Sequence, residues 1–185
     1  MTGVQTCALP ISLAIGLIVL AALATTFIAQ NKAYNVQEQV TGMLQAARAG
    51  IDIMGREIIM AGFDPAEEMQ LTDPDEDDFV GIPLPASNPA SVIEIYADLN
   101  GDGDTADANE HIIYAFANGQ LTRNTGSGAQ PFIENVEDFE VEYLEADGTT
   151  KATSTEDIRQ VRVTLEVGTG RADVDYPRTR TLTSS

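Results

Sequence analysis

Thirteen residues between two β-rich segments hold the one pattern of side chains in this sequence that has a defined chemistry. Positions 98–110 read DLNGDGDTADANE and carry five carboxylates. Oxygen ligands at alternate positions, followed by a glycine that allows a sharp turn, are what a calcium-binding loop requires. Carboxylates this close together also repel one another unless a cation lies among them. The pattern therefore predicts a structural calcium site with the ligands Asp98, Asn100, Asp102, Asp104, Asp107 and Glu110.

This loop departs in two ways from the calcium loops that lie between helices. The twelfth position, where such loops carry a bidentate acid, is Asn109. The flanking segments also have the pattern of strands rather than helices. We therefore expect a calcium-binding β-loop that is closed by Asp107 or Glu110. The alternative is a polar hairpin loop, rich in turn-forming residues, that binds no metal.

The net charge of −19 lies entirely after residue 63. Residues 1–63 balance three basic against three acidic side chains, whereas residues 64–185 contain 26 acidic and 7 basic ones. A domain of this charge repels nucleic acid and anionic lipid, and it attracts cations. The composition therefore argues against nucleic acid as a partner. Acidity that only keeps a secreted domain soluble explains the charge equally well.

A long helix is predicted for residues 12–62. Residues 11–29 carry no charge and meet the ~20 residues needed to cross a bilayer. The apolar region of a secretory signal, the alternative, is shorter and would be followed by a loop. Here apolar residues recur at spacings of three and four beyond Lys32, and Gly62 with Pro65 marks the end. We expect this helix to leave the membrane and to pack its stripe on a sheet. The stripe comprises Val36, Val40, Met43, Leu44, Ala47, Ile51, Met54 and Ile58.

The first eleven residues have the pattern of an artefact. Residues 2–11, TGVQTCALPI, match the in-frame translation of a common sequencing-library adapter. We therefore predict that residues 1–11 are adapter-derived and that the natural start of the protein is not in this sequence. The alternative is a natural N-terminus. On the first interpretation Cys7, the single cysteine, says nothing about redox compartment or disulfides.

The helix and its end resemble a known family. SLAIGLIVLAA from Ser12, followed by a polar stem and then by REIIMAGF at 56–63, is similar to the PilW-type minor type IV pilins and to the J-type minor pseudopilins of type II secretion. The segments 136–143 and 158–165 also look like the closing strands of such heads. The family's cleavage glycine and N-terminal glutamate have no counterpart here. The resemblance implies storage in the inner membrane, cleavage by prepilin peptidase and assembly with other pilin or pseudopilin subunits through the helix.

Residues 63–185 are predicted to form an acidic, β-rich head domain. Alternating apolar residues indicate strands, and Asn118–Gly119 is typical of a hairpin turn. Antiparallel pairing would set Arg159 or Arg162 beside Glu140 or Glu142. The predicted fold class is α+β: a long N-terminal transmembrane and stem helix, a pilin-like lollipop, packed on an antiparallel β-sheet head. The expected strands are 92–97, 111–116, 120–123, 136–143, 158–165 and a strand-like RTRTL at 178–182.

The sequence favours assembly over catalysis. It has no nucleophile elbow, phosphate-binding loop or pair of metal-binding histidines. The single histidine, His111, is interpreted as structural, paired with Glu110. We expect a minor pilin-like subunit that takes part in assembly of a type IV pilus or a type II secretion pseudopilus, with its head outside the inner membrane. The alternative is a signal-anchored extracytoplasmic module for calcium-dependent binding or adhesion.

Overall fold

The computed structural model describes residues 5–67, 79–169 and 180–184, which divide between two compact units, 1–42 and 43–185. One helix, α1, belongs to both units, and the strands belong to the second. The elements are α1 (Gln5–Ile59), β1 (Val92–Tyr96), β2 (His111–Ala117), β3 (Gln120–Asn124), β4 (Gln130–Glu134), β5 (Val136–Leu144), the 3-10 helix η1 (Thr155–Asp157), β6 (Gln160–Val167) and β7 (Arg180–Ser184). The α+β fold class is therefore confirmed.

The first unit is the N-terminal part of α1, which begins at Gln5, inside the stretch predicted to be adapter-derived. Nine large apolar side chains between Leu13 and Ile28 are each more than half exposed. The segment that starts at Ser12 reaches a mean hydropathy of 2.3 and is long and apolar enough to cross a membrane. Apolar surface exposed over several helical turns is favourable in lipid and unfavourable in water.

The helix ends at Ile59, three residues before the predicted end at Gly62. Gly62 has a φ of +77° and donates its N–H to the carbonyl of Tyr96 at 2.9 Å. Glycine adopts this left-handed conformation without the steric penalty of a side chain. Gly62 therefore turns the chain out of the helix and ties it to the end of β1.

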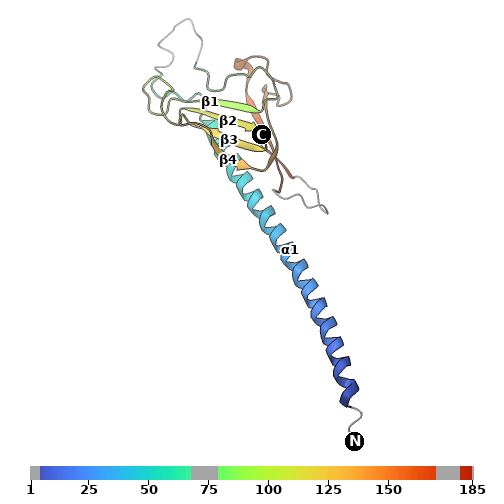
Figure 1. Cartoon of the computed structure of the whole chain (residues 1–185). Coiled ribbons are helices and arrows are strands. Elements are labelled where there is room, and N and C mark those ends of the chain that lie inside the picture. Colours follow the sequence, from blue (N-terminus) through green and yellow to red (C-terminus); the bar gives the residue numbers. More distant parts are fainter. Residues whose placement is uncertain (1–4, 68–78, 170–179, 185) are drawn as a thin grey trace. The chain divides into compact units, whose positions relative to one another are not determined.

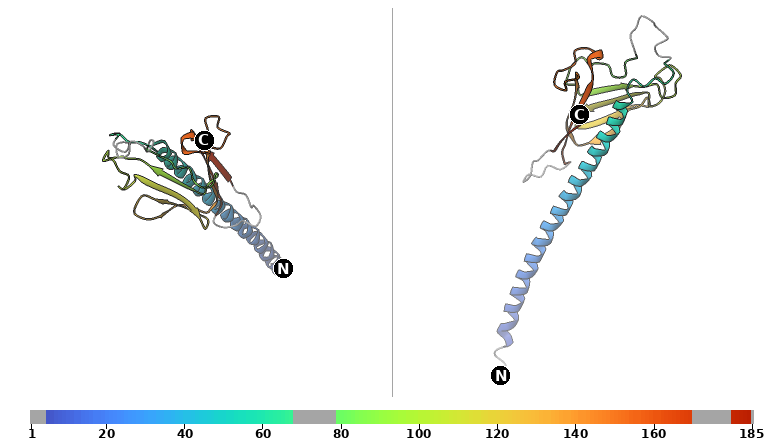
Figure 2. Two further views of the ribbon diagram at one scale, coloured as in Figure 1. Left: turned by 90° about the horizontal axis from the view of Figure 1, so that it is seen from above. Right: turned by 180° about the vertical axis from the view of Figure 1, so that it is seen from behind.

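Two antiparallel sheets make up most of the second unit. The first has the order β1-β2-β3-β4, and the second has the order β5-β6-β7. The views in Figures 1 and 2 agree that β1 to β4 lie side by side, next to the C-terminal end of α1. Strands β1, β2, β3, β5 and β6 lie where the sequence predicts strands, and β7 overlaps the strand-like RTRTL segment. Strand β4 was not predicted because Pro131 interrupts its short apolar pattern.

Residues of α1 from Met43 onward pack into the core of the second unit. Ala47 and Met54 are almost completely buried, with Ile51 and Ile58 packed beside them. This confirms the predicted packing for Met43, Ala47, Ile51, Met54 and Ile58 of the apolar stripe. The sheets contribute the other large buried side chains, among them Ile93, Ile95, Tyr114, Leu121, Phe139, Val141, Tyr143 and Leu165.

The predicted cross-strand ion pair is formed by one of the two arginines. Glu142 of β5 lies opposite Arg162 of β6, and the Arg162 Nη1 donates to the Glu142 Oε2 at 3.0 Å. Arg159 instead donates to the backbone carbonyls of Glu156 and Ile158. Arg159 lies one residue before β6 begins. It is therefore outside the paired strands that would place it beside an acid.

Candidate functional site: the acidic loop

The acidic loop connects β1 to β2, and the pairing of these strands determines where its two ends lie. Tyr96 is opposite His111, and Ala97 donates its N–H to the carbonyl of Glu110 at 2.9 Å, which extends the ladder by one step. The side chains of Asp98 and Glu110 consequently lie at the base of the loop. Both are buried, with exposed fractions of 0% and 2%.

Asp98 folds the first half of the loop around its carboxylate. Its Oδ1 accepts the N–H of Gly101 at 2.6 Å, and its Oδ2 accepts the N–H of Gly103 at 2.9 Å. A carboxylate that accepts two backbone N–H groups is compensated for its loss of hydration. This acid therefore has a structural role in shaping the loop.

Glu110 has a corresponding role from the other end. Its Oε1 accepts the N–H groups of Leu99 and Asn100 at 3.0 Å and 3.2 Å. Its Oε2 accepts the N–H of Asp107 at 3.2 Å. One buried glutamate thus ties together the beginning and the end of the loop.

The exposed acids gather around the Asn100 amide. Its Nδ2 donates to Asp102 at 3.0 Å and to Asp107 at 2.7 Å, so that an amide nitrogen lies between two carboxylates. Carboxylate oxygens of Asp102, Asp104 and Glu110 lie within 4.8 Å of one another. Ligands on opposite sides of a calcium ion are about 4.8 Å apart, since each Ca–O bond is roughly 2.4 Å. The donor type and spacing of these three residues therefore fit calcium.

The six predicted ligands thus fall into two groups. Asp102, Asp104 and Glu110 come together, whereas Asp98 binds loop N–H groups and Asn100 presents its amide nitrogen to the acids. Asn100 would have to rotate its amide to offer the oxygen that a cation requires. Asp107 lies beside Asn100 rather than within the group of three.

His111 is not paired with Glu110, contrary to the prediction. Its Nε2 lies 3.4 Å from the Oε2 of Glu94, and its ring stacks on Tyr96 with centroids 4.2 Å apart. The physical reason is strand alternation: His111 points to the opposite face from its neighbour Glu110 and lies directly across from Tyr96 on β1.

A second polar cluster, which the sequence did not predict, joins α1 to the first sheet. Glu57 is buried, and its Oε1 accepts the Arg123 Nη2 at 2.6 Å. The Oε2 of Glu57 accepts the hydroxyl of Tyr114 and, at 3.3 Å, the Nε of Arg123. The sequence did contain a signal for this cluster. Glu57 lies three residues after the buried Met54, on the apolar face of the helix, and an acid buried there requires a partner.

The pKa values of the groups around Glu57 reflect this environment. Burial and then the hydrogen bond to Glu57 raise the pKa of Tyr114 well above its usual value. Burial lowers the pKa of Arg123, but the hydrogen bonds and the charge of Glu57 act against burial and raise it overall. The arrangement therefore favours a neutral tyrosine and a charged arginine.

Buried tyrosines predict a loss of stability at alkaline pH. Burial, reinforced by the bond to Glu94, raises the pKa of Tyr96 to about 12, and burial also raises those of Tyr114 and Tyr143. Above pH 10 the unfolded chain therefore releases protons that the folded chain retains. We expect the free energy of unfolding to fall by about 1.4 kcal/mol per pH unit for each of the buried Tyr114 and Tyr143, and by less for the partly exposed Tyr96 because solvent screens its charge.

Urea unfolding of the full chain between pH 9 and pH 11.5 measures this slope. Tyr96→Phe is the control, because it should make the slope shallower by one tyrosine's contribution. A free energy of unfolding that is constant over this range would contradict the assignment.

Comparison of the chain with protein-family models and with curated proteins finds no match to either.

Proposed function

We propose that this chain is a minor pilin-like subunit that takes part in assembly of a type IV pilus or a type II secretion pseudopilus. The observation that carries the proposal is the division of one helix into two environments. The stretch from Leu13 to Ile28 exposes its apolar side chains, whereas Ala47 and Met54 of the same helix are buried in the core of the second unit. The exposed part can contact lipid or other helices, and the buried part belongs to the core of a folded domain.

The resemblance at residues 12–22 and 56–63 supplies the biological setting of the proposal. The precursor is held in the inner membrane by α1 with its head outside the cytoplasm, and prepilin peptidase processes it. Other pilin or pseudopilin subunits then pack along the helix. The role is structural, not enzymatic.

Calcium has a structural role in this proposal. The carboxylates of Asp102, Asp104 and Glu110 would hold the ion, while Asp98 shapes the loop through Gly101 and Gly103. When bound, calcium supplies positive charge that offsets repulsion among the acids. The loop would then be more rigid at the end of the first sheet.

Placing charges on the outer part of the helix stripe should prevent assembly. Val36→Asp with Val40→Asp puts two carboxylates where apolar contacts between helices are proposed, and desolvating them is strongly unfavourable. We expect recovery of pilin-like subunits with the full chain, solubilised from membranes, to fall by about tenfold or more. Met43 is left unchanged because it packs on the core.

The control carries the same added charge on exposed positions of the same helix, as Gln39→Asp with Thr41→Asp. Its recovery of partner subunits should stay near that of the natural chain. Equal recovery with both variants would show that the stripe is not an assembly surface and would overturn the proposal.

A further inference from the structure

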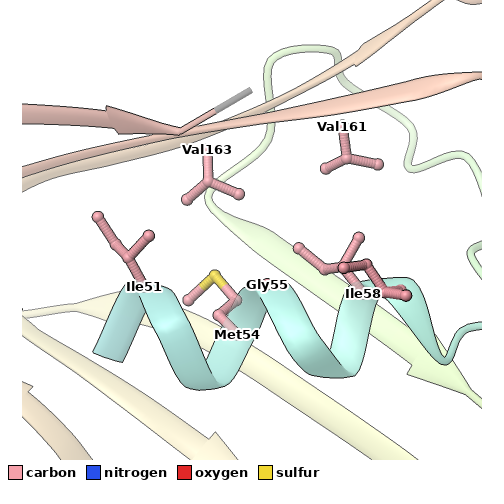
Figure 3. Close-up of a pocket in the computed structure, with 7 residues that line it drawn as sticks. Ile51, Met54, Gly55, Ile58, Val161 and Val163 are labelled. Atoms are coloured by element: carbon pink, nitrogen blue, oxygen red, sulfur yellow. The ribbon is translucent and has the colours of Figure 1, made fainter. Parts of the chain in front are cut away.

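A small apolar pocket lies between the last turns of α1 and strand β6. Figure 3 shows Val161 and Val163 pointing from β6 toward Ile51 and Ile58 of the helix. The pocket has a volume of about 160 Å³. An apolar cavity of roughly 150 Å³ in another protein stays dry and binds benzene, so this volume suits one apolar group. The lining consists of Ile51, Met54, Gly55, Ile58, Val161 and Val163, with Ile59 at its edge.

Gly55 keeps this pocket open. A Cβ atom built at this position would meet no atom within 4 Å. Glycine in the interior of a helix is less favourable than alanine, because it loses more backbone freedom on folding. The helix therefore carries a destabilising residue at a position where a larger one would fill the cavity.

The edge of the pocket is an exposed apolar surface. Ile59 contributes to the lining although 84% of its surface is exposed, and Val80, in the groove beside the pocket, is 42% exposed. A wider groove shares Ile58, Ile59 and Val161 with the pocket and extends to residues 79–82. An apolar hollow surrounded by exposed apolar side chains is typical of a surface that binds another protein.

The net charge of the domain indicates which kind of protein can bind at this pocket. Residues 64–185 carry the whole net charge of −19, so two copies of this domain repel each other as they approach. A chain that is neutral or basic beside the contacting side chain meets no such repulsion. The occupant is therefore a different chain.

We propose that this pocket receives one apolar side chain, of leucine or phenylalanine size, from a different and non-acidic subunit of the same assembly. This inference rests on the proposed function, since it names a contact between subunits that the helix brings together. The side chain enters beside Ile59 and packs against Met54, Ile58 and Val163.

Photocrosslinking from the edge of the pocket tests the contact. The full chain carries benzoylphenylalanine at position 59 and is made in cells that produce the other subunits of the system. We expect a crosslink to an apolar residue of a different subunit. Gly55→Leu and Val161→Phe fill the pocket from opposite walls, so each should lower the yield by about tenfold or more. If one of the two fails to fold, the other still provides the test.

Val92→Phe is the matched control, because Val92 is also an exposed apolar residue of the second unit but does not line the pocket. It should leave the yield within about twofold of the natural chain. A crosslink to a second copy or to lipid, no crosslink, or a yield unchanged by filling would overturn the inference. If pilin-like subunits are still recovered with the chain in those cases, the proposed function stands. If they are not recovered either, both fail.

Discussion

Replacing Glu57 by alanine should destabilise the second unit by about 2–4 kcal/mol. The substitution leaves the Arg123 guanidinium and the Tyr114 hydroxyl without the carboxylate that binds both. Removing one partner of a buried ion pair typically costs about 3–5 kcal/mol. The expected value is somewhat lower here because the side chain of Arg123 is 25% exposed and water can solvate part of its charge. Urea unfolding of the full chain in detergent micelles measures the change.

Asp52→Ala provides the matched control for Glu57→Ala. Asp52 lies on the same helix and its removal changes the net charge equally, but it is exposed. We expect a change within about 0.5 kcal/mol. If Glu57→Ala lost no more stability than Asp52→Ala, the buried pair would not be what holds the helix on the sheet.

A third variant separates the ion pair from the packing around it. Glu57→Leu, Arg123→Met and Tyr114→Phe together remove every polar group of the cluster and preserve most of its volume. Such replacements are often neutral or stabilising. Stability within about 1 kcal/mol of the natural chain would indicate that the cluster specifies how the helix lies on the sheet rather than contributing net stability.

Calcium should raise the melting temperature of the second unit by roughly 3–10 °C at 10 mM. Extracellular calcium modules bind with dissociation constants of about 0.1–1 mM. At 10 mM calcium is present at about 10–100 times such a constant, which stabilises the folded state by about 1.4–2.7 kcal/mol. For a domain of this size each kcal/mol shifts the melting temperature by about 2–4 °C. Thermal unfolding of the chelator-treated full chain, with and without calcium, measures the shift.

Asp102→Asn with Asp104→Asn should abolish this shift while leaving the calcium-free melting temperature nearly unchanged. Both residues are exposed members of the proposed ligand group. Asp98 is unsuitable for this test because it binds Gly101 and Gly103, so its loss would unfold the loop whether or not calcium binds. Glu134→Gln with Glu140→Gln removes the same charge from exposed positions on strands and should leave the calcium response intact. A natural chain that melts at the same temperature with and without 10 mM calcium would contradict the site.

The sequence predicted the elements whose periodicity is long and regular. The apolar stripe of α1 and the alternation in β5 and β6 each extend over enough residues to set both the type of element and the face it buries. Strand β4 was missed because its five residues, with Pro131 at the second position, carry too little pattern. The register between β5 and β6 could be expected only as far as a pairing of Arg159 or Arg162 with Glu140 or Glu142, and the structure pairs Arg162 with Glu142.

In the acidic loop, ligand spacing does not distinguish the roles of the individual acids. Ligand spacing selected the segment in which Asp102, Asp104 and Glu110 come together, but it treated Asp98 and Asp102 as equivalent. Their difference comes from the ends of β1 and β2, which bury Asp98 and Glu110 under the loop backbone and leave Asp102 and Asp104 exposed. The Glu57–Arg123 pair was missed for a related reason: the partner is 66 residues away, and only the folded sheet brings it to the helix.

The most direct test of the central proposal is the recovery of pilin-like subunits with the full chain in the presence and absence of a calcium chelator. A helix-mediated assembly predicts that the chain recovers these subunits equally well in both conditions, and that Val36→Asp with Val40→Asp lowers the recovery by about tenfold or more. Recovery that survives the charged helix face but disappears with the chelator would contradict the proposal. That result would instead favour an anchored module that binds its partners through the acidic loop.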